Sequence, residues 1–284
     1  MANASRRDAL GDRMKRYEEA TRFILPRRTY TLLRVDGRAF HSWTRGLNKP
    51  YDSEFMYAMD QTAETLCGSI PGAQFAYVQS DEISVLAVDF LDIKTEPWFD
   101  GNIQKWASVA AALATSAFNS VVSSFVRDNK FMHENPTGRG VITKIGDKQA
   151  NAAFDARVFT IPDPIEVENY FVWRQQDAER NSVTMLARAY ASHKALAGKK
   201  RADQHEIIHA AGDNWAKHPV RFKHGGVIRH VRWTTSHGVE HTHKTNWHLD
   251  DNTPVFTKDR AYLRSLVPIV WNDDLLVRKA TANG

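Results

Sequence analysis

The segment Arg34-Val35-Asp36-Gly37-Arg38-Ala39-Phe40 decides how the fold of this chain is interpreted. It closes a run of β-branched and aromatic residues at positions 29–35, a composition typical of a β-strand. The pair Asp36-Gly37 then predicts a turn, because glycine tolerates positive φ. We therefore expect Asp36 at the C-terminal end of a strand.

A second acidic segment, Ser80-Asp81-Glu82, lies between two more strand-like runs, residues 74–79 and 83–88. This pattern predicts a β-hairpin with the acidic residues at or near its bend. If the hairpin lies beside the first strand, Asp36 and Asp81 meet at one edge of the sheet, where carboxylates could bind one or two Mg²⁺ ions. Acidic turns that bind nothing are also common, so the spacing alone leaves both interpretations open.

The rest of the chain supplies the elements of a mixed fold. Periodicity and composition predict helices at residues 8–21, 53–66 and 102–127, and a further strand at 154–160. The order strand, helix, hairpin, helix, strand is the βαββαβ plan of ferredoxin-like folds, which the palm of many polymerases and nucleotide cyclases share. We therefore predict an α+β fold. Residues 1–160 would form a palm-like core with an N-terminal helix, and residues 161–284 a C-terminal extension of helices and short strands packed on it.

The composition limits the class of protein. Of the 284 residues, 42% are hydrophobic and 25% charged, which is ordinary for a soluble globular protein. The single cysteine, Cys67, excludes an internal disulfide and fits a reducing compartment. The first 20 residues lack the apolar region of a secretory signal, and no apolar run of membrane-spanning length is evident, so we expect a cytoplasmic protein without a membrane partner. The formal net charge of +5 favours a polyanionic partner such as nucleic acid.

The C-terminal half is helical, basic and rich in histidine. Helical periodicity continues through residues 166–196, and a loop-and-strand pattern follows at 220–228. Its candidates for contacts with an RNA backbone are Lys194, Lys199, Lys200, Arg201 and Lys223. Four histidines follow: His237, His241, His243 and His248. They suggest either a zinc site or a solvated or RNA-facing hairpin, and the absence of a nearby cysteine favours the hairpin.

Five successive segments resemble the motifs of the tRNA-histidine guanylyltransferase family, in the family's order and with similar gaps. The match extends from about Leu10 to about Ile228. The segments are Arg34-Val35-Asp36-Gly37-Arg38-Ala39-Phe40-His41, Lys49-Pro50-Tyr51-Asp52, Ala76-Tyr77-Val78-Gln79-Ser80-Asp81-Glu82, Phe154-Asp155-Ala156-Arg157-Val158 and Trp173-Arg174-Gln175-Gln176-Asp177. Five collinear motifs are far more specific than any one of them.

The resemblance implies an enzyme that adds nucleotides to the 5′ end of RNA in the 3′-to-5′ direction, on a palm-like core with two Mg²⁺ ions. It places the metal ligands at Asp36, the Gly37 carbonyl and Asp81, with Glu82 beside them as a further catalytic carboxylate. The implied substrates are tRNA and nucleoside triphosphates, namely GTP, and ATP where the 5′ end needs activation. The implied assembly is a homotetramer.

The resemblance also assigns contacts with the nucleotide. Positions that match the family's triphosphate and nucleotide contacts are Lys49, Asp52, Ser80 and Lys105. Three more residues lie where the family's loop closes on the nucleotide: Arg34, Arg38 and His41.

One departure from the family pattern bears on the subclass. Eukaryotic-type members carry His-Ile-Asn-Asn after the Trp-Arg-Gln segment, whereas this chain has Glu179-Arg180-Asn181-Ser182. In this respect the chain is more similar to the Thg1-like proteins, which resemble template-directed polymerases that rebuild truncated tRNA 5′ ends. Three alternatives stay open: addition of an untemplated G to histidine tRNA, a cyclase-like enzyme acting on nucleotides alone, and a non-catalytic RNA-binding protein. The intact pair Asp36 and Asp81 argues against the last.

Overall fold

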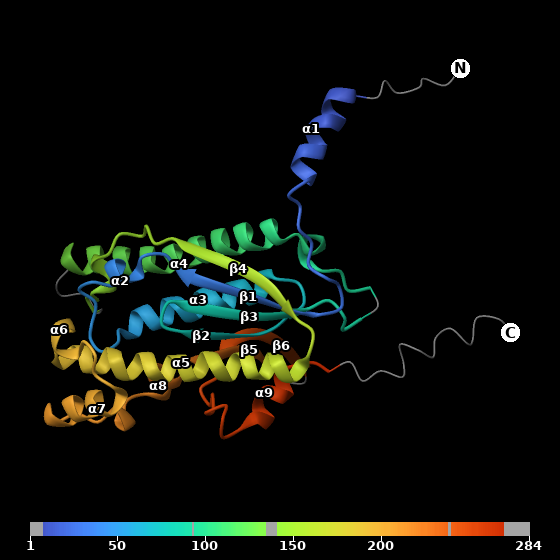
Figure 1. Cartoon of the computed structure of the whole chain (residues 1–284). Coiled ribbons are helices and arrows are strands. Elements are labelled where there is room, and N and C mark those ends of the chain that lie inside the picture. The colour runs from blue at the N-terminus through green and yellow to red at the C-terminus, as the bar shows by residue number, and fades with distance from the viewer. Residues whose placement is uncertain (1–7, 93, 135–140, 238–239, 270–284) are drawn as a thin grey trace, which may run out of the picture.

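The computed structural model of the chain describes residues 8–92, 94–134, 141–237 and 240–269, without the side chains of residues 231–245. Its centre is a six-stranded antiparallel sheet with helices on both faces (Figure 1). Four of its strands are the predicted ones: β1 (Tyr30–Gly37), β2 (Ala73–Gln79), β3 (Glu82–Val88) and β4 (Phe154–Ile161). Their order, β4-β1-β3-β2, is that of the βαββαβ plan, so the predicted α+β, palm-like fold is confirmed.

Two helices cover one face of the sheet, α3 (Ser53–Ser69) and α4 (Ile103–Glu134). The start of α3 is fixed locally, because the Asp52 carboxylate accepts a hydrogen bond of 3.0 Å from the Phe55 amide and caps the helix. Alternate residues of β1, Leu33 and Val35, point to this face, as the pleat of a strand requires. The result is one continuous apolar core between the sheet and both helices.

The opposite face carries α5 (Pro164–Tyr190) and the short helix α9 (Arg260–Leu266). The Asp163 carboxylate caps α5, and Pro164 occupies the first turn, where its missing N–H costs nothing. The predicted helix at 166–196 is thus broken: α5 ends at Tyr190, and Ser192 caps a separate helix, α6 (His193–Leu196).

Within the described residues, α4 is also the one helix long and apolar enough to cross a membrane, by length and composition alone. This corrects the expectation that no apolar stretch of that length exists. The helix packs a stripe of buried residues, including Trp106, Phe118 and Val122, against the sheet. The core helix of a water-soluble protein passes the same test of length and composition.

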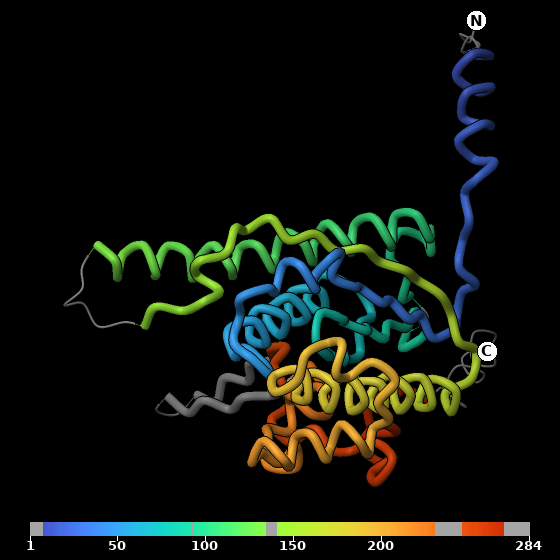
Figure 2. The backbone as a smooth tube through the Cα atoms, turned by 60° about the vertical axis from the view of Figure 1, so that its left-hand side comes forward, coloured from blue at the N-terminus to red at the C-terminus, as the bar shows by residue number. Residues whose placement is uncertain are grey.

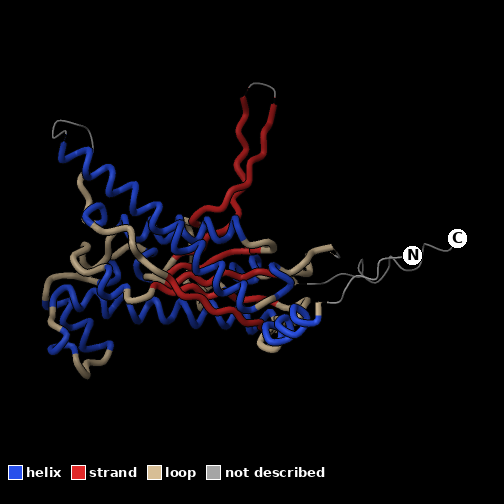
Figure 3. The backbone as a smooth tube through the Cα atoms, turned by 90° about the horizontal axis from the view of Figure 1, so that it is seen from above, coloured by secondary structure: helices blue, strands red, loops and turns tan. Residues whose placement is uncertain are grey.

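The C-terminal half also contributes two short helices and two strands. Helices α7 (Arg201–Ala210) and α8 (Val220–His224) pack on the C-terminal half of α5, where Phe222 is buried. The loop predicted at the start of the 220–228 segment is therefore a helical turn, which the burial of Phe222 stabilises. Strand β5 (Gly226–His237) pairs with β2 and extends the core sheet. Strand β6 (Glu240–Leu249) completes a hairpin that reaches beyond the sheet (Figure 3).

The predicted N-terminal helix is present as α1 (Ala9–Glu19), and it stands apart from the body of the molecule (Figures 1 and 2). None of its residues is buried, and its apolar residues Leu10, Met14 and Tyr17 are exposed. The remaining short elements are α2 (Phe40–Trp43) and three 3₁₀ turns at Trp98–Gly101, Ile145–Asp147 and Trp215–Lys217.

The turn predicted at Asp36-Gly37 lies two residues later. β1 continues through Gly37, and the backbone turns at Ala39, whose φ of 57° is left-handed. Gly37 is required for a different reason, since a Cβ at that position would lie 2.4 Å from the Phe40 ring. Asp36 therefore stays within the strand, where its neighbours are set by the sheet register.

Candidate active site

The sheet register brings acidic residues together at the C-terminal end of β1. Asp36 lies directly opposite Glu82 of β3 and opposite Asp155 of β4. The Gly37 amide donates a hydrogen bond of 3.0 Å to the Asp81 carbonyl. The structure thus places Asp36, Gly37, Asp81 and Glu82 at one edge of the sheet, and their roles at a metal site stay a prediction.

These carboxylates repel one another. Burial, and then the charges of Asp81, Glu82 and Asp155, raise the pKa of Asp36 from 3.8 to about 6. Burial also raises the pKa of Asp81, although a hydrogen bond from Ser80 and the charge of His41 oppose the shift. Both side chains therefore lie where a cation would relieve an electrostatic penalty.

The Ser80-Asp81 turn itself is tight. β2 and β3 pair up to Gln79 and Glu82, so only two residues connect them. Ser80 has a φ of 47°, in the left-handed region that a side chain other than glycine's adopts at a cost. The connection fixes Asp81 at the rim of the sheet.

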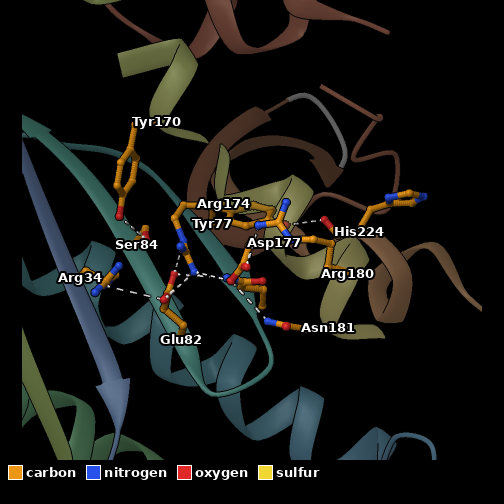
Figure 4. Close-up of polar contacts among 11 residues, drawn as sticks. Arg34, Tyr77, Glu82, Ser84, Tyr170, Arg174, Asp177, Arg180, Asn181 and His224 are labelled. Carbon is orange, nitrogen blue, oxygen red and sulfur yellow. Dashed lines mark hydrogen bonds and ion pairs between the residues drawn. The ribbon is translucent and has the colours of Figure 1, made fainter. Parts of the chain in front are cut away.

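Glu82 has a different environment from the other acids. Its carboxylate accepts two hydrogen bonds from Arg174 of α5, one from Nε at 2.8 Å and one from Nη2 at 2.9 Å (Figure 4). Arg34 Nε lies 3.8 Å from the same carboxylate, and the Gln79 amide nitrogen lies 3.4 Å from it. The Glu82 charge is thus engaged within the protein, which argues against the predicted role as a catalytic carboxylate and for a structural one.

Arg174 connects this edge to the rest of α5. Its side chain is 6% exposed, and its Nη2 also donates a hydrogen bond of 3.0 Å to Asp177. Asp177 in turn accepts from Arg180 at 2.9 Å and from the Asn181 amide nitrogen at 3.3 Å (Figure 4). A continuous polar network therefore runs from the sheet edge along the helix.

A pocket of about 570 Å³ opens beside the acidic edge. Its walls come from the loop after α2, the start of α3, the β2–β3 turn, and helices α5 and α8. Five of the predicted site residues line it: His41, Lys49, Asp52, Ser80 and Asp81. The cationic side chains in the lining suit a polyphosphate, and the acidic rim suits a divalent cation.

Asp52 is held in place by the fold. Beyond its hydrogen bond to Phe55, its second oxygen accepts from the backbone and side-chain nitrogens of Asn48, at 3.1 and 3.0 Å. At 3% exposure it is part of the pocket wall, and three protein donors already occupy its oxygens.

Three predicted nucleotide contacts lie outside this pocket. Arg34 lies beside Glu82, and Arg38 is exposed on the turn after β1. Lys105 lies at the first turn of α4, where it lines a separate pocket with Lys15 of α1 and with Arg22, which follows that helix. The structure does not bring Lys105 to the other predicted contacts within one chain.

Two of the predicted RNA contacts are engaged within the protein. The Lys223 ammonium donates to the Ala216 carbonyl at 2.6 Å and lies over the Trp215 ring. Arg201 forms an ion pair with Glu179. Lys194, Lys199 and Lys200 are exposed.

The histidine-rich segment forms the predicted hairpin. His237, His241 and His243 belong to the backbone pairing of β5 and β6, and their side chains lie outside the described residues. His248 Nδ1 lies 3.6 Å from Glu64 Oε1.

The acidic edge suits Mg²⁺ better than a metal ion that takes all of its ligands from the protein. In the part of the chain that the structure describes, no three His, Cys, Asp or Glu side chains form a metal-binding group. Mg²⁺ commonly keeps several waters and takes one or two carboxylates together with substrate phosphates. Asp36, Asp81 and the Gly37 carbonyl could supply such a partial set of hard oxygen ligands.

Sequence reasoning did not identify four residues that shape this site. Asp155 was known only as part of a motif, although the fourth strand places it beside Asp36. Arg174 could have been suspected, because an arginine inside a core helix needs a buried partner. Asn181 and Arg188 line the pocket from α5. Asn181 stands out in the sequence only within the segment that departs from the family pattern, and no local pattern marks Arg188.

Comparison with known proteins gives a consistent result. Residues 11–162 match the family model described as tRNAHis guanylyltransferase. A bacterial tRNA(His) guanylyltransferase (Thg1)-like protein solved in complex with ATP is 37% identical, with a TM-score of 0.76, covering 92% of this chain and 99% of that one. A structure with the same description in complex with GTP is 35% identical, with a TM-score of 0.68, covering 92% and 100%. Uncharacterized protein R259 of Acanthamoeba polyphaga mimivirus is 28% identical over 236 residues, which are 78% of this chain and 77% of that protein.

The buried ion pair predicts a large effect of Glu82→Ala on stability. Without Glu82, the Arg174 charge stays buried with one partner, Asp177, and we expect a loss of about 3–5 kcal/mol in the free energy of unfolding by urea. The double variant Glu82→Ala/Arg174→Met should recover most of it. Glu96→Ala, which breaks an exposed pair with Arg27, should cost about 1 kcal/mol or less. Equal effects of the two single variants would contradict the structural role.

The raised pKa of Asp36 predicts a pH dependence in metal-free protein. The pKa of Asp36 is about 6 in the folded protein, above the ordinary value of 3.8 that we expect for the unfolded chain. The free energy of unfolding therefore rises as pH falls through this range and Asp36 is protonated in the folded state, and it falls again as pH rises. Asp36→Asn should therefore be more stable than wild type near pH 7, and the difference in Tm should shrink by about pH 4–5. Asp12→Asn, on exposed α1, is the matched control. If the difference in Tm between Asp36→Asn and wild type did not vary with pH, the pKa of Asp36 would not be raised in the folded protein.

Proposed function

Because the chain belongs to the tRNAHis guanylyltransferase family, we propose that it is a nucleotidyltransferase that adds nucleotides to the 5′ end of tRNA in the 3′-to-5′ direction, with the opposing strand as template. The observation that carries the proposal is the acidic edge of Asp36 and Asp81, opening into a pocket lined by basic side chains. Acidic and basic groups side by side are what a nucleoside triphosphate with its divalent cation requires.

In the proposed reaction, the 3′-hydroxyl of the incoming nucleotide attacks the 5′-phosphorus of the RNA. The new bond joins the 3′-oxygen to that phosphorus, and the leaving group is pyrophosphate from a triphosphate end or AMP from an adenylylated end. Asp36, Asp81 and the Gly37 carbonyl would hold two Mg²⁺ ions. When bound, these ions supply an attacking oxygen of lowered pKa and offset negative charge at phosphorus.

The other residues of the pocket bind and orient the nucleotide. Lys49 and His41 lie in its lining and would neutralise the triphosphate. Asp52 holds the Asn48 loop against the start of α3, so it positions Lys49 in the adjoining loop. Two solved relatives, one in complex with ATP and one in complex with GTP, support nucleoside triphosphates as substrates. We propose that ATP activates a 5′-monophosphate end.

Two observations favour templated addition over dedicated addition of one G. The segment Glu179-Arg180-Asn181-Ser182 stands where eukaryotic-type members have His-Ile-Asn-Asn. In addition, the structural relative at 37% identity is a bacterial Thg1-like protein. No feature of the described site favours a cyclase, so we put that alternative second.

We also propose a homotetramer. Helix α1 leaves Leu10, Met14 and Tyr17 exposed, and Phe23 is exposed in the segment that follows. Apolar side chains gathered on a projecting element are typical of a surface that another subunit covers.

Removal of either central acid should abolish addition. We expect Asp36→Ala and Asp81→Ala each to lower the rate of nucleotide addition to a 5′-truncated tRNA about a thousandfold or more at saturating Mg²⁺, because several kcal/mol of transition-state stabilisation is lost. Binding of tRNA in a filter or fluorescence assay should change little. Asp128→Ala, on the exposed side of α4, is the matched control. Near wild-type turnover by either variant would refute the site assignment.

The choice of nucleotide tests the templating. A tRNA lacking its first nucleotide is offered with each NTP in turn, and then a second tRNA in which the opposing base has been changed. We expect the added base to follow the opposing base in both. Addition of G to both substrates would indicate untemplated guanylyl transfer, and a cyclic product from NTP without RNA would favour the cyclase.

A further inference from the structure

Helix α5 forms one wall of the pocket. This wall is separate from the acidic edge and from the loop after α2, to which the proposed reaction already gives roles. Ala178, Asn181, Met185 and Arg188 line this wall at intervals of three or four residues, so they lie along one stripe of the helix. Asn181 and Arg188 are separated by about 10 Å along the axis, at 1.5 Å per residue. The stripe is long enough to contact two separate groups of a bound molecule.

Most other polar groups on this side of the pocket are already engaged. Arg221 donates to the Asp60 carboxylate from both Nη2, at 2.6 Å, and Nε, at 3.1 Å. The Ser182 hydroxyl donates to the Glu179 carbonyl at 2.9 Å and accepts from Trp215 Nε1 at 3.0 Å. The Arg221 charge is therefore paired with Asp60, and the Ser182 hydroxyl hydrogen is already donated within the protein.

Asn181 is different, because the polar network fixes its orientation. Its amide nitrogen donates to Asp177, and a carboxylate can only accept, so the nitrogen must face Asp177 (Figure 4). Asp177 is itself held by Arg174. Asn181 is exposed, and among the described residues its side-chain oxygen has no hydrogen-bond partner. It is therefore an acceptor with a fixed direction in the lining of the pocket.

Arg188 is a cationic side chain without a partner in the described part of the chain. It is exposed in the pocket lining, and within the described part of the chain it makes no hydrogen bond or ion pair. Glu179 and Asp177, the acids on the same helix within three turns of it, pair with Arg201 and with Arg174 and Arg180. No described carboxylate neutralises Arg188.

We propose that this stripe of α5 is a second substrate-binding surface of the pocket, in which Arg188 binds a phosphate group and the Asn181 oxygen accepts a hydrogen bond from the sugar or base of the same substrate. The inference rests on the proposed nucleotidyltransferase function. The phosphate belongs either to the incoming nucleotide or to the RNA strand, and both present the same chemistry to a guanidinium.

The test is Arg188→Gln, measured in two arms. One arm titrates GTP with Mg²⁺ in the absence of RNA, and the other titrates a 5′-truncated tRNA over a range of salt concentrations. A lost charge-assisted contact should weaken binding about 10- to 100-fold in the arm that contains its phosphate. If the phosphate is the RNA's, the salt dependence of binding should also fall by about 0.7 to 0.9 of a unit. The matched control is Arg127→Gln, an exposed arginine on α4 at the other face of the sheet.

Asn181→Ala tests the acceptor in the same two arms. We expect about a 3- to 15-fold weaker affinity in the arm that Arg188→Gln affects, with the Tm unchanged because Asn181 is exposed. If both variants bind GTP and tRNA as tightly as wild type, the inference is wrong while the proposed function stands. If wild type binds neither GTP nor tRNA, the proposed function and this inference are both wrong.

Discussion

The bidentate pair between Arg174 and Glu82 is the contact on which the rest of the arrangement depends. It joins residues 92 positions apart, one in the central helix of the C-terminal half and one at the rim of the core sheet. Both side chains are removed from water, so each needs the other to avoid an uncompensated charge. The pair therefore ties the position of α5 to the edge of the sheet where the acidic residues gather.

The same pair sets the charge balance of the edge. Arg174 pairs with the Glu82 carboxylate, whereas burial and the neighbouring acids raise the pKa of Asp36, a penalty that a cationic ligand could relieve. The pocket beyond them is basic, with His41 and Lys49 in its lining. A nucleoside triphosphate with bound Mg²⁺ matches this arrangement, because its cation suits the acidic edge and its phosphates suit the basic side chains of the pocket.

Helix α5 serves two surfaces at once. Arg174 faces the sheet, whereas the stripe from Asn181 to Arg188 faces the pocket, and Asp177 joins the two by hydrogen bonds. A change at the buried pair would therefore shift the pocket wall as well as lower stability. The C-terminal half also adds β5 to the core sheet, so the halves of the chain share one hydrogen-bonded framework.

The sequence by itself determined the local elements: the strand before Asp36, the hairpin around Ser80-Asp81, the cap at Asp52 and the order that gives the palm-like plan. These follow from periodicity, turn residues and caps, which act over a few positions of the chain. Tertiary structure alone decided the rest. It placed Asp155 beside Asp36, engaged Glu82 with Arg174, kept Lys105 at another pocket and gave α5 its pocket-facing stripe. The physical reason is that burial and charge pairing depend on which distant segments pack together, and no short-range pattern records that choice.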